Sequence, residues 1–198
     1  MDRVRKKKKA RQNEIYATAA ELFASKGYHA TRIQDIANQL GMRKGSLYYY
    51  FATKEELLGR VTEGRIEEML GAMEAIIATN HTPTQKLTLA IDEHLRLYKK
   101  HANIFAIFTQ ENLAEINFET AKVVRTVSKK YQSLWKAILQ EGIERGEFQA
   151  GLDLEITMQA ILGMCNHTLI WYKSDGRLEI REIARLFAQL IISGIQTP

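Results

Sequence analysis

Residues 31–58 read TRIQDIANQLGMRKGSLYYYFATKEELL and contain the clearest structural pattern of the chain. Apolar residues recur in it at helical spacing up to Gly41, and this spacing predicts a short helix with one buried face. Gly41 can adopt a positive φ, so it favours a tight turn after that helix. A second short helix is predicted over residues 44–50, anchored by Leu47 and Phe51 one turn apart.

Helices are also predicted on both sides of this pair. The apolar spacing over residues 11–26 predicts a helix that ends at Gly27. Thr31 and Gln34 form the pattern of a capping box for the next helix, and Thr53 is a suitable cap for a longer fourth helix. Two short helices joined by a tight turn, preceded by a third helix and surrounded by basic residues, are typical of a helix-turn-helix DNA-binding unit.

The rest of the chain predicts helices and no strand. Thr82, Pro83 and Gln85 form a strong helix start, because they supply a cap, a first-turn proline and a return hydrogen bond. Later helices are predicted over residues 103–111 in shorter pieces, 118–145 with an end at Gly146, 153–171 with Asp153 as its cap, and 179–193. The predicted fold class is therefore all-α, with about nine helices. The expected parts are a basic flexible tail over residues 1–10, a three-helix helix-turn-helix domain over 11–56 and a C-terminal helical domain over 57–198.

The 198 residues carry a formal net charge of +5, and the positive charge is concentrated at the start of the chain. Residues 1–60 hold thirteen Lys or Arg against six Asp or Glu, including the run Lys6–Lys9. Counterion release favours such a segment beside phosphates, so the predicted partner is a polyanion, nucleic acid before an anionic membrane. The basic tail either follows the DNA backbone or is only solvated.

Other features of the sequence indicate a cytoplasmic protein that does not enter a membrane. The single cysteine, Cys165, cannot form an intramolecular disulfide. No uninterrupted apolar run reaches the roughly 18 residues that a membrane span requires. Glu14 and Glu21 follow the basic start at the place where a secretory signal needs an apolar segment.

Residues 31–58 resemble the DNA-binding segment of the tetracycline-repressor (TetR) family of transcriptional regulators. The resemblance covers residues 11–60, and the later helices agree with that family in number and length. It implies a homodimer that binds a double-stranded DNA operator. The residues that it places at the DNA are Lys44, Gly45, Ser46, Tyr48, Tyr49, Tyr50 and, against a phosphate, Lys54.

The chemistry of these side chains agrees with DNA contact. Lys44 can donate to guanine acceptors, Gln34 can pair with adenine, and the Tyr and Ser hydroxyls can bond phosphate oxygens. Arg43 departs from the family, which often has a small hydroxyl residue there that caps the recognition helix. Its guanidinium is expected to contact a phosphate or base instead and to alter operator preference. For Tyr48 the alternative is partial packing beside Leu47.

The second half of the chain is larger than DNA binding requires, so it is expected to supply dimerisation, ligand sensing or both. The resemblance implies that the last two helices pair across a two-fold axis into a four-helix bundle. The apolar residues expected at that interface are Ile156, Ile161, Leu162, Ile183, Leu186, Phe187, Leu190 and Ile191. The alternative is that they form only the core of a monomer.

An apolar pocket between the later helices is the expected effector site, because helical bundles often enclose one, and it predicts a small hydrophobic effector. The candidate lining residues are Leu95, Tyr98, Phe105, Phe108, Leu134, Trp135, Ile138, Met164, Cys165 and Trp171. The segment from Trp171 to Arg177 is similar to family members that sense acyl-CoA thioesters, which implies an effector of that class. The basic residues that either meet its phosphates or form an exposed helical face are Lys122, Arg125, Lys129 and Lys130.

The predicted function is a repressor that a small effector releases from a palindromic operator. A ligand-dependent activator or co-repressor stays open and so, more remotely, does a protein held on a membrane surface by its basic tail. No GxSxG, HExxH or phosphate-binding Gly-loop motif occurs, so neither an enzyme nor a cofactor is expected. Two pairs of residues could suggest a metal site, but core or surface roles explain them better: Cys165 with His167, and His94 with His101.

Overall fold

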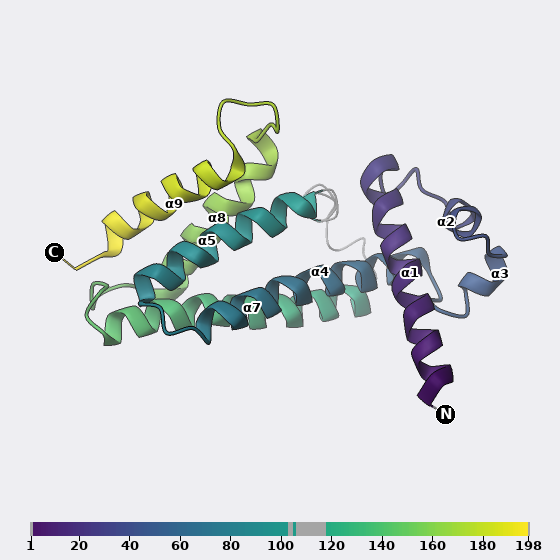
Figure 1. Ribbon diagram of the computed structural model, residues 1–198, viewed down its shortest axis with the longest axis horizontal. Coiled ribbons are helices and arrows are strands. Elements are labelled where there is room, and N and C mark those ends of the chain that lie inside the picture. Colours follow the sequence, from purple (N-terminus) through teal and green to yellow (C-terminus); the bar gives the residue numbers. More distant parts are fainter. Residues whose placement is uncertain (1, 103–104, 106–117, 198) are drawn as a thin grey trace. The chain divides into compact units, whose positions relative to one another are not determined.

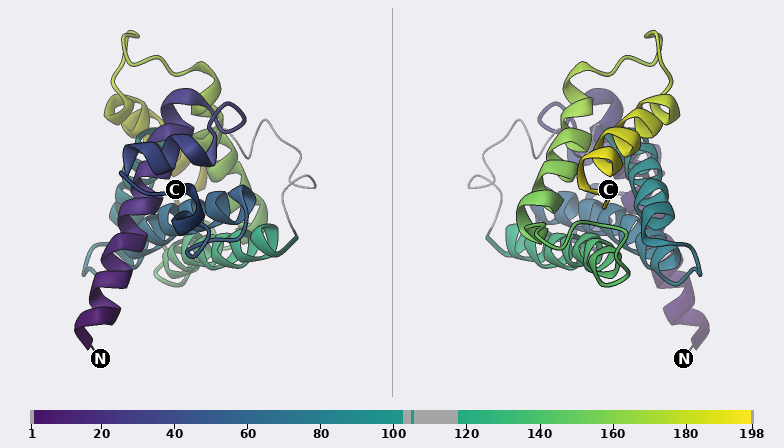
Figure 2. Two further views of the ribbon diagram at one scale, coloured as in Figure 1. Left: turned by 90° about the vertical axis from the view of Figure 1, so that its right-hand side faces the viewer. Right: turned by 90° about the vertical axis from the view of Figure 1, so that its left-hand side faces the viewer.

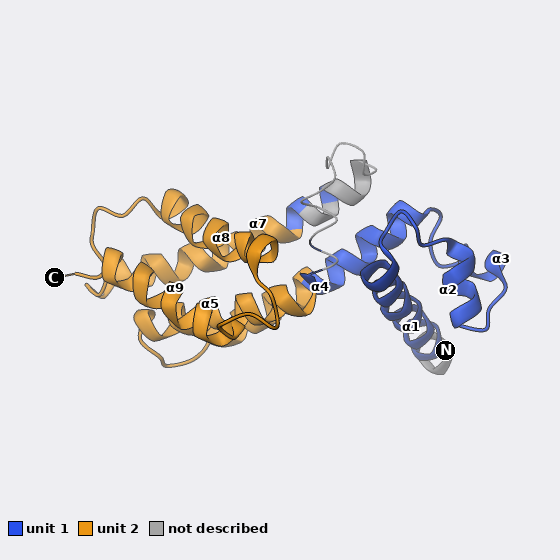
Figure 3. Ribbon diagram, turned by 90° about the horizontal axis from the view of Figure 1, so that it is seen from above, with its two compact units in different colours: residues 1–65, 102–126 blue, residues 66–101, 127–198 orange. Residues whose placement is uncertain are grey.

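The computed structural model describes residues 2–102, 105 and 118–197. The described residues form eight helices and, apart from one isolated bridge between Phe148 and Gln196, no strand (Figure 1). The all-α prediction is therefore confirmed. The chain divides into two compact units, here called unit 1 (residues 1–65 and 102–126) and unit 2 (residues 66–101 and 127–198) (Figure 3). Of the shorter helical pieces predicted over residues 103–111, all but Phe105 lie outside the described residues.

Unit 1 contains the predicted helix-turn-helix arrangement. Its helices are α1 (Asp2–Lys26), α2 (Ile33–Gln39), α3 (Lys44–Leu47) and the first part of α4 (Lys54–Ile77). Their buried side chains form one apolar core: Ile15, Ala19, Ala20, Phe23, Ile33, Ile36, Ala37, Leu47, Phe51, Leu57, Leu58 and Val61. Gly41 lies between α2 and α3 with a φ of 62°, so the tight turn uses the glycine conformation that was predicted.

Helix α1 is longer than the helix predicted over residues 11–26. It begins at Asp2, so the basic run Lys6–Lys9 lies on a helix and not in a flexible tail. Lys and Arg are good helix formers, and the turns over residues 11–26 supply the nucleus that an isolated segment would lack. The expected tail over residues 1–10 is therefore corrected to the first turns of α1.

Helix α2 does not begin with the predicted capping box of Thr31 and Gln34. The Thr31 hydroxyl donates back to two carbonyl oxygens near the end of α1. The Asp35 carboxylate instead accepts from the backbone N–H of Arg32 at 2.8 Å. The Lys26 ammonium, 2.6 Å from the same carboxylate, and this N–H hold the pKa of Asp35 below its ordinary value. The predicted cap was therefore wrong by one residue.

Unit 2 is organised around α5 (Pro83–Lys100). This helix packs against both α8 (Leu154–Trp171) and α9 (Ile180–Ile195) (Figure 2). The other helices of unit 2 are the second part of α4 and most of α7 (Phe118–Glu144). One face of α5 is buried along its whole length by these contacts, and that face includes two polar residues, Lys86 and His94.

Hydrogen bonds confirm the predicted helix ends in unit 2. Thr82 Oγ1 accepts from the Gln85 backbone N–H at 3.3 Å, and Gln85 Oε1 accepts in return from the Thr82 N–H at 3.0 Å. Asp153 Oδ1 accepts from two backbone N–H groups in the first turn of α8. Gly146 follows α7 with a φ of 73°. These caps and turns satisfy backbone groups that helix ends would otherwise leave unpaired.

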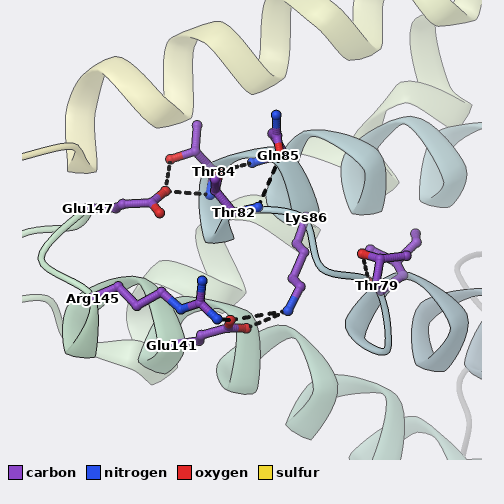
Figure 4. A network of polar contacts seen from close by, with 9 residues as sticks. Thr79, Thr82, Thr84, Gln85, Lys86, Glu141, Arg145 and Glu147 are labelled. Atoms are coloured by element: carbon purple, nitrogen blue, oxygen red, sulfur yellow. Dashed lines mark hydrogen bonds and ion pairs between the residues drawn. The ribbon is translucent and has the colours of Figure 1, made fainter.

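A buried ion pair joins α5 to α7 (Figure 4). Lys86 is 5% exposed, and its Nζ lies 3.1 and 2.9 Å from the two carboxylate oxygens of Glu141. Arg145 reaches the same carboxylate at 2.7 Å. Glu147, which follows α7, accepts hydrogen bonds from the backbone N–H and the hydroxyl of Thr84. This network therefore holds the first turn of α5 against the end of α7.

A neutral histidine links three helices inside unit 2. His94 of α5 is 3% exposed, with Nδ1 2.9 Å from the Tyr131 hydroxyl of α7 and Nε2 2.9 Å from Asn166 Oδ1 of α8. An amide oxygen only accepts, so with this amide orientation Nε2 carries the proton and Tyr131 donates to Nδ1. Burial lowers the pKa of His94 to about 4, because the charged ring would lose its hydration. The ring therefore connects the helices without carrying charge at neutral pH.

The first prediction concerns the buried ion pair. Glu141→Gln is expected to lower the free energy of unfolding by about 2 to 4 kcal/mol, because it leaves the ammonium of Lys86 buried without a carboxylate. Lys86→Met is expected to cost less, because it removes the buried charge while Glu141 keeps its contact with Arg145. Urea unfolding of the wild type and both variants measures these changes. A larger loss in Lys86→Met than in Glu141→Gln would contradict this account.

The second prediction concerns pH. The pKa of His94 in the folded chain lies below the ordinary value of 6.5, so the unfolded chain binds a proton first as the pH falls. Stability that is fully present above pH 6.5 is therefore lost between pH 6.5 and about pH 4, by about 3 kcal/mol. Urea unfolding across this range should show a shallower pH dependence in His94→Gln than in the wild type. Identical dependences would show that His94 does not stay neutral in the fold.

Candidate DNA-binding surface and effector site

The polar residues of α3 lie on the surface of unit 1. Leu47 is fully buried and anchors this four-residue helix, whereas Lys44, Gly45 and Ser46 are exposed. No atom lies within 4 Å of where a side chain at Gly45 would begin, so packing within the chain does not require glycine there. The outward positions can therefore accept close contact with another molecule.

The three tyrosines after α3 differ in exposure. Tyr49 is 73% exposed and Tyr48 is 45% exposed, with its ring tilted against Phe51. Tyr50 is half-buried and packs against the core of unit 1. The alternative of partial packing thus describes Tyr50 better than Tyr48, because the chain turns at the end of α3 and brings the third tyrosine back to the core. Tyr49 is the most accessible of the three phenol groups.

The remaining predicted DNA contacts are Gln34, Arg43 and Lys54. Gln34 is exposed on α2, and its Nε2 donates to Asn38 Oδ1 at 2.8 Å. Arg43 is exposed at the start of α3 and makes no side-chain capping bond, in agreement with its lack of an acceptor. Lys54 begins α4 with its Nζ 4.2 Å from the centre of the Tyr28 ring, which orients the ammonium. We name the following exposed residues the HTH surface: Gln34, Arg43, Lys44, Gly45, Ser46, Tyr48 and Tyr49.

Most of the predicted effector residues belong to the core of unit 2. The buried ones are Leu95, Tyr98, Trp135, Ile138 and Cys165. The half-buried ones are Phe105, Leu134 and Met164, and Phe108 lies outside the described residues. Trp135 packs edge-on against His94 and Tyr131. Core packing therefore accounts for the buried members of this set.

Trp171 is not buried with these residues. It is 46% exposed at the end of α8, and its ring lies edge-on to Phe187 of α9. Both rings line a surface groove of about 340 Å³, to which Tyr172, Lys173 and Arg177 also contribute. Volumes of about 300 to 1,000 Å³ are typical of ligand sites. The groove thus combines aromatic faces with exposed cations from the segment between Trp171 and Arg177, of which the predicted lining residues included only Trp171.

The residues predicted for the dimer interface separate into two sets. Ile161, Leu162 and Ile183 are buried in the core of unit 2, so they are corrected from interface to core residues. The exposed ones are Ile156, Leu186 and Leu190, and the half-buried ones are Phe187 and Ile191. Helical periodicity marks apolar faces but does not say which face the chain itself covers.

One exposed apolar residue of this surface was missed. Ile170 is 76% exposed near the end of α8, beside Trp171. Its signal was the run Leu169, Ile170 and Trp171, because three consecutive helical residues cannot all face one core. We name the exposed apolar residues of α8 and α9 the α8–α9 face: Ile156, Ile170, Trp171, Leu186 and Leu190.

The residues considered for a metal site do not converge. Cys165 is fully buried and His167 is exposed, and burial raises the pKa of the Cys165 thiol to about 12, which makes it inert. His101 pairs with Glu68 at 2.9 Å, whereas His94 bonds Tyr131 and Asn166. Within the described ranges no three His, Cys, Asp or Glu residues are arranged to hold a metal ion. No helix in the described part of the chain is long and apolar enough to cross a membrane.

Two family profiles match this chain. Residues 15–61 match bacterial regulatory proteins of the tetR family, and residues 80–195 match the tetracyclin repressor-like C-terminal domain. The first match contains α2, α3 and the HTH surface. The second contains α5, α7, α8 and α9.

Individual relatives extend the similarity over nearly the whole chain. The fatty acid metabolism regulator protein of Bacillus subtilis (strain 168) is 31% identical over 191 residues, which cover 96% of this chain and 98% of that protein. The HTH-type transcriptional repressor KstR2 of Mycolicibacterium smegmatis is 29% identical, over 94% of this chain and 91% of the relative. The structure of the regulator FadR from Bacillus subtilis in complex with stearoyl-CoA has a TM-score of 0.78 at 32% identity, covering 92% and 98% of the two chains. The chain therefore belongs to the TetR family of transcriptional regulators.

Proposed function

We propose that this regulator is a homodimeric repressor that an acyl-CoA thioester releases from a palindromic DNA operator. The observation that carries the proposal is the HTH surface, on which one buried anchor, Leu47, turns the polar side of α3 outward. Two copies related by a two-fold axis would present two such surfaces to successive major grooves, about 34 to 36 Å apart. The operator would then repeat the same half-site in opposite directions.

The chemistry of the HTH surface supports base reading together with phosphate contact. The Lys44 ammonium is a donor for guanine acceptors in the major groove. Gln34 would pair with adenine after exchanging its present bond to Asn38. Ser46 and Tyr49 carry exposed hydroxyls that can donate to phosphate oxygens.

The α8–α9 face supports a dimer. Its five large apolar side chains are between 46% and 76% exposed, and the family profile covers both helices. The same face of α8 carries small exposed residues, Ala160 and Gly163, which allow another helix to approach closely. Pairing this face with its copy would form an isologous interface.

Two observations support an acyl-CoA effector. The Bacillus subtilis relative is named a fatty acid metabolism regulator, and the FadR structure contains stearoyl-CoA. In this chain, Tyr172 offers an aromatic face to a groove that Lys173 and Arg177 line with cations. A nucleotide head with phosphates needs such a combination. Trp171 and Leu186, which also line this groove, belong to the α8–α9 face, so the effector would bind at the edge of the proposed dimer interface.

Release follows from a difference in effector affinity between two states of the dimer. Helix α4 is one continuous helix whose residues belong to both units, so it connects unit 2, the proposed effector-binding unit, covalently to the unit that carries the HTH surface. An effector that binds better when the two HTH surfaces are misplaced shifts the population toward that state and lowers DNA affinity. An activator or co-repressor would result if the effector favoured the DNA-competent state.

The third prediction separates base reading from phosphate contact. DNA is first selected by the wild type from a pool of random duplexes. Lys44→Ala should weaken binding to the selected duplex by about 1 to 3 kcal/mol and leave binding to random duplex nearly unchanged. Lys54→Ala should weaken both about equally, because a phosphate contact carries no base information. Equal losses on both duplexes for Lys44→Ala would assign that residue to phosphates, and selection of no duplex would overturn the proposal.

The fourth prediction tests the dimer. Leu190→Glu should convert the protein to monomers, because it places a charge inside the proposed interface. The loss of the dimer should also weaken operator binding. Leu89→Glu is the matched control, because Leu89 is also an exposed leucine, 40% exposed, but lies on α5. Sedimentation measures the association state of both variants. A dimer that tolerates Leu190→Glu as well as Leu89→Glu would exclude the α8–α9 face as its interface.

A further inference from the structure

The first turns of α1 contact the helix-turn-helix. Ile15 of α1 is fully buried in the core of unit 1. About one turn nearer the N-terminus, Arg11 Nη2 donates to the carbonyl oxygen of Leu40, at the end of α2, at 3.1 Å. About one turn further, Lys8 Nζ lies 4.7 Å from the centre of the Tyr49 ring and 3.5 Å from its hydroxyl oxygen. The contacts therefore continue from the core to the HTH surface.

Helical geometry explains why these contacts form a series. Positions 8, 11 and 15 are three or four residues apart, so their side chains lie on one face of a helix. The face of α1 that packs into the core is thus the same face that brings Lys8 to Tyr49. The N-terminal turns are oriented by this packing and do not act as an independent arm.

The charges of these turns favour contact with a polyanion. Residues 3–9 contain six Lys or Arg and no Asp or Glu. Like charges three or four residues apart repel each other, and cations near a helix N-terminus oppose the helix dipole, each by a few tenths of a kcal/mol to about 1 kcal/mol. Phosphates beside these residues would remove this repulsion and release counterions from the DNA.

The contact between Lys8 and Tyr49 can serve a single phosphate. Lysine carries three N–H donors, and only one points to the Tyr49 hydroxyl. That hydroxyl accepts from Lys8 and can donate its own proton to a phosphate oxygen. The Tyr49 side chain is 73% exposed, so a phosphate can approach both groups.

We propose that Lys8 and Tyr49 form a clamp for one DNA backbone phosphate in each half-site. The inference rests on the proposed function, because it requires that the HTH surface binds DNA. It adds a contact of fixed position, made jointly by α1 and the second residue after α3. A flexible basic tail would add charge to the complex without such a position.

The test compares three alanine variants that each remove one lysine charge. Lys7 and Lys9 lie about 100° around the helix from Lys8, so Lys7→Ala and Lys9→Ala are the matched controls. On the duplex selected by the wild type, Lys8→Ala should weaken binding about five- to tenfold and lower the salt slope by about one phosphate contact. The controls should weaken binding less than about twofold. Ethylation interference should show one phosphate per half-site that matters to the wild type and not to Lys8→Ala.

A second background tests whether the two residues act together. In Tyr49→Ala, the further change Lys8→Ala should cost no more than the two controls do, because the clamp is already lost. Equal losses for the three lysines, or an undiminished Lys8 effect in Tyr49→Ala, would overturn the clamp while DNA binding stands. A wild type that binds no duplex would overturn the clamp together with the proposed function. If the wild type bound phosphatidylserine vesicles and not DNA, and Lys8→Ala lost this binding, the basic residues of α1 would be assigned to a membrane surface. That result would overturn the clamp as well.

Discussion

The HTH surface depends on the burial of Leu47. Helix α3 has four residues, far fewer than a helix needs to be stable alone in water. Leu47, the last residue of α3, is fully buried and Phe51, four residues later, is 3% exposed, so the core of unit 1 holds the end of this helix and the segment that follows it. The same burial turns Lys44, Gly45 and Ser46 outward. Stability and the proposed DNA contact are therefore assigned to opposite sides of one short helix.

The helices could be predicted well where local chemistry decides them. Thr82 and Asp153 cap their helices as predicted, because their side-chain oxygens accept from backbone N–H groups in the first turn. Thr31 has such partners: it donates to carbonyl oxygens near the end of α1, so the predicted cap failed. The predicted start of α1 was wrong for a related reason. The run Lys6–Lys9 shows that the segment is charged, but it does not show whether contacts with the rest of unit 1 stabilise a helix there.

The candidate sites could be predicted only where they lie on consecutive residues. The HTH surface occupies one short segment, so its exposed members follow from the position of Leu47. The His94 links, by contrast, come from three helices, and the groove at Trp171 depends on how α8 and α9 approach each other. Periodicity places Ile156 and Ile161 about 140° apart on α8, but both faces carry apolar residues, so it could not tell that the chain itself covers only the face of Ile161.

The proposed regulation requires that effector binding in unit 2 lowers the DNA affinity of the HTH surface. A footprint of the wild type on the duplex it selects, titrated with saturated acyl-CoA thioesters of increasing chain length and with free CoA, measures this change. We expect protection of a short palindrome that disappears with at least one acyl-CoA and persists with free CoA. Protection that every thioester leaves unchanged would contradict release by an acyl-CoA, and protection that appears only with a thioester would contradict its direction.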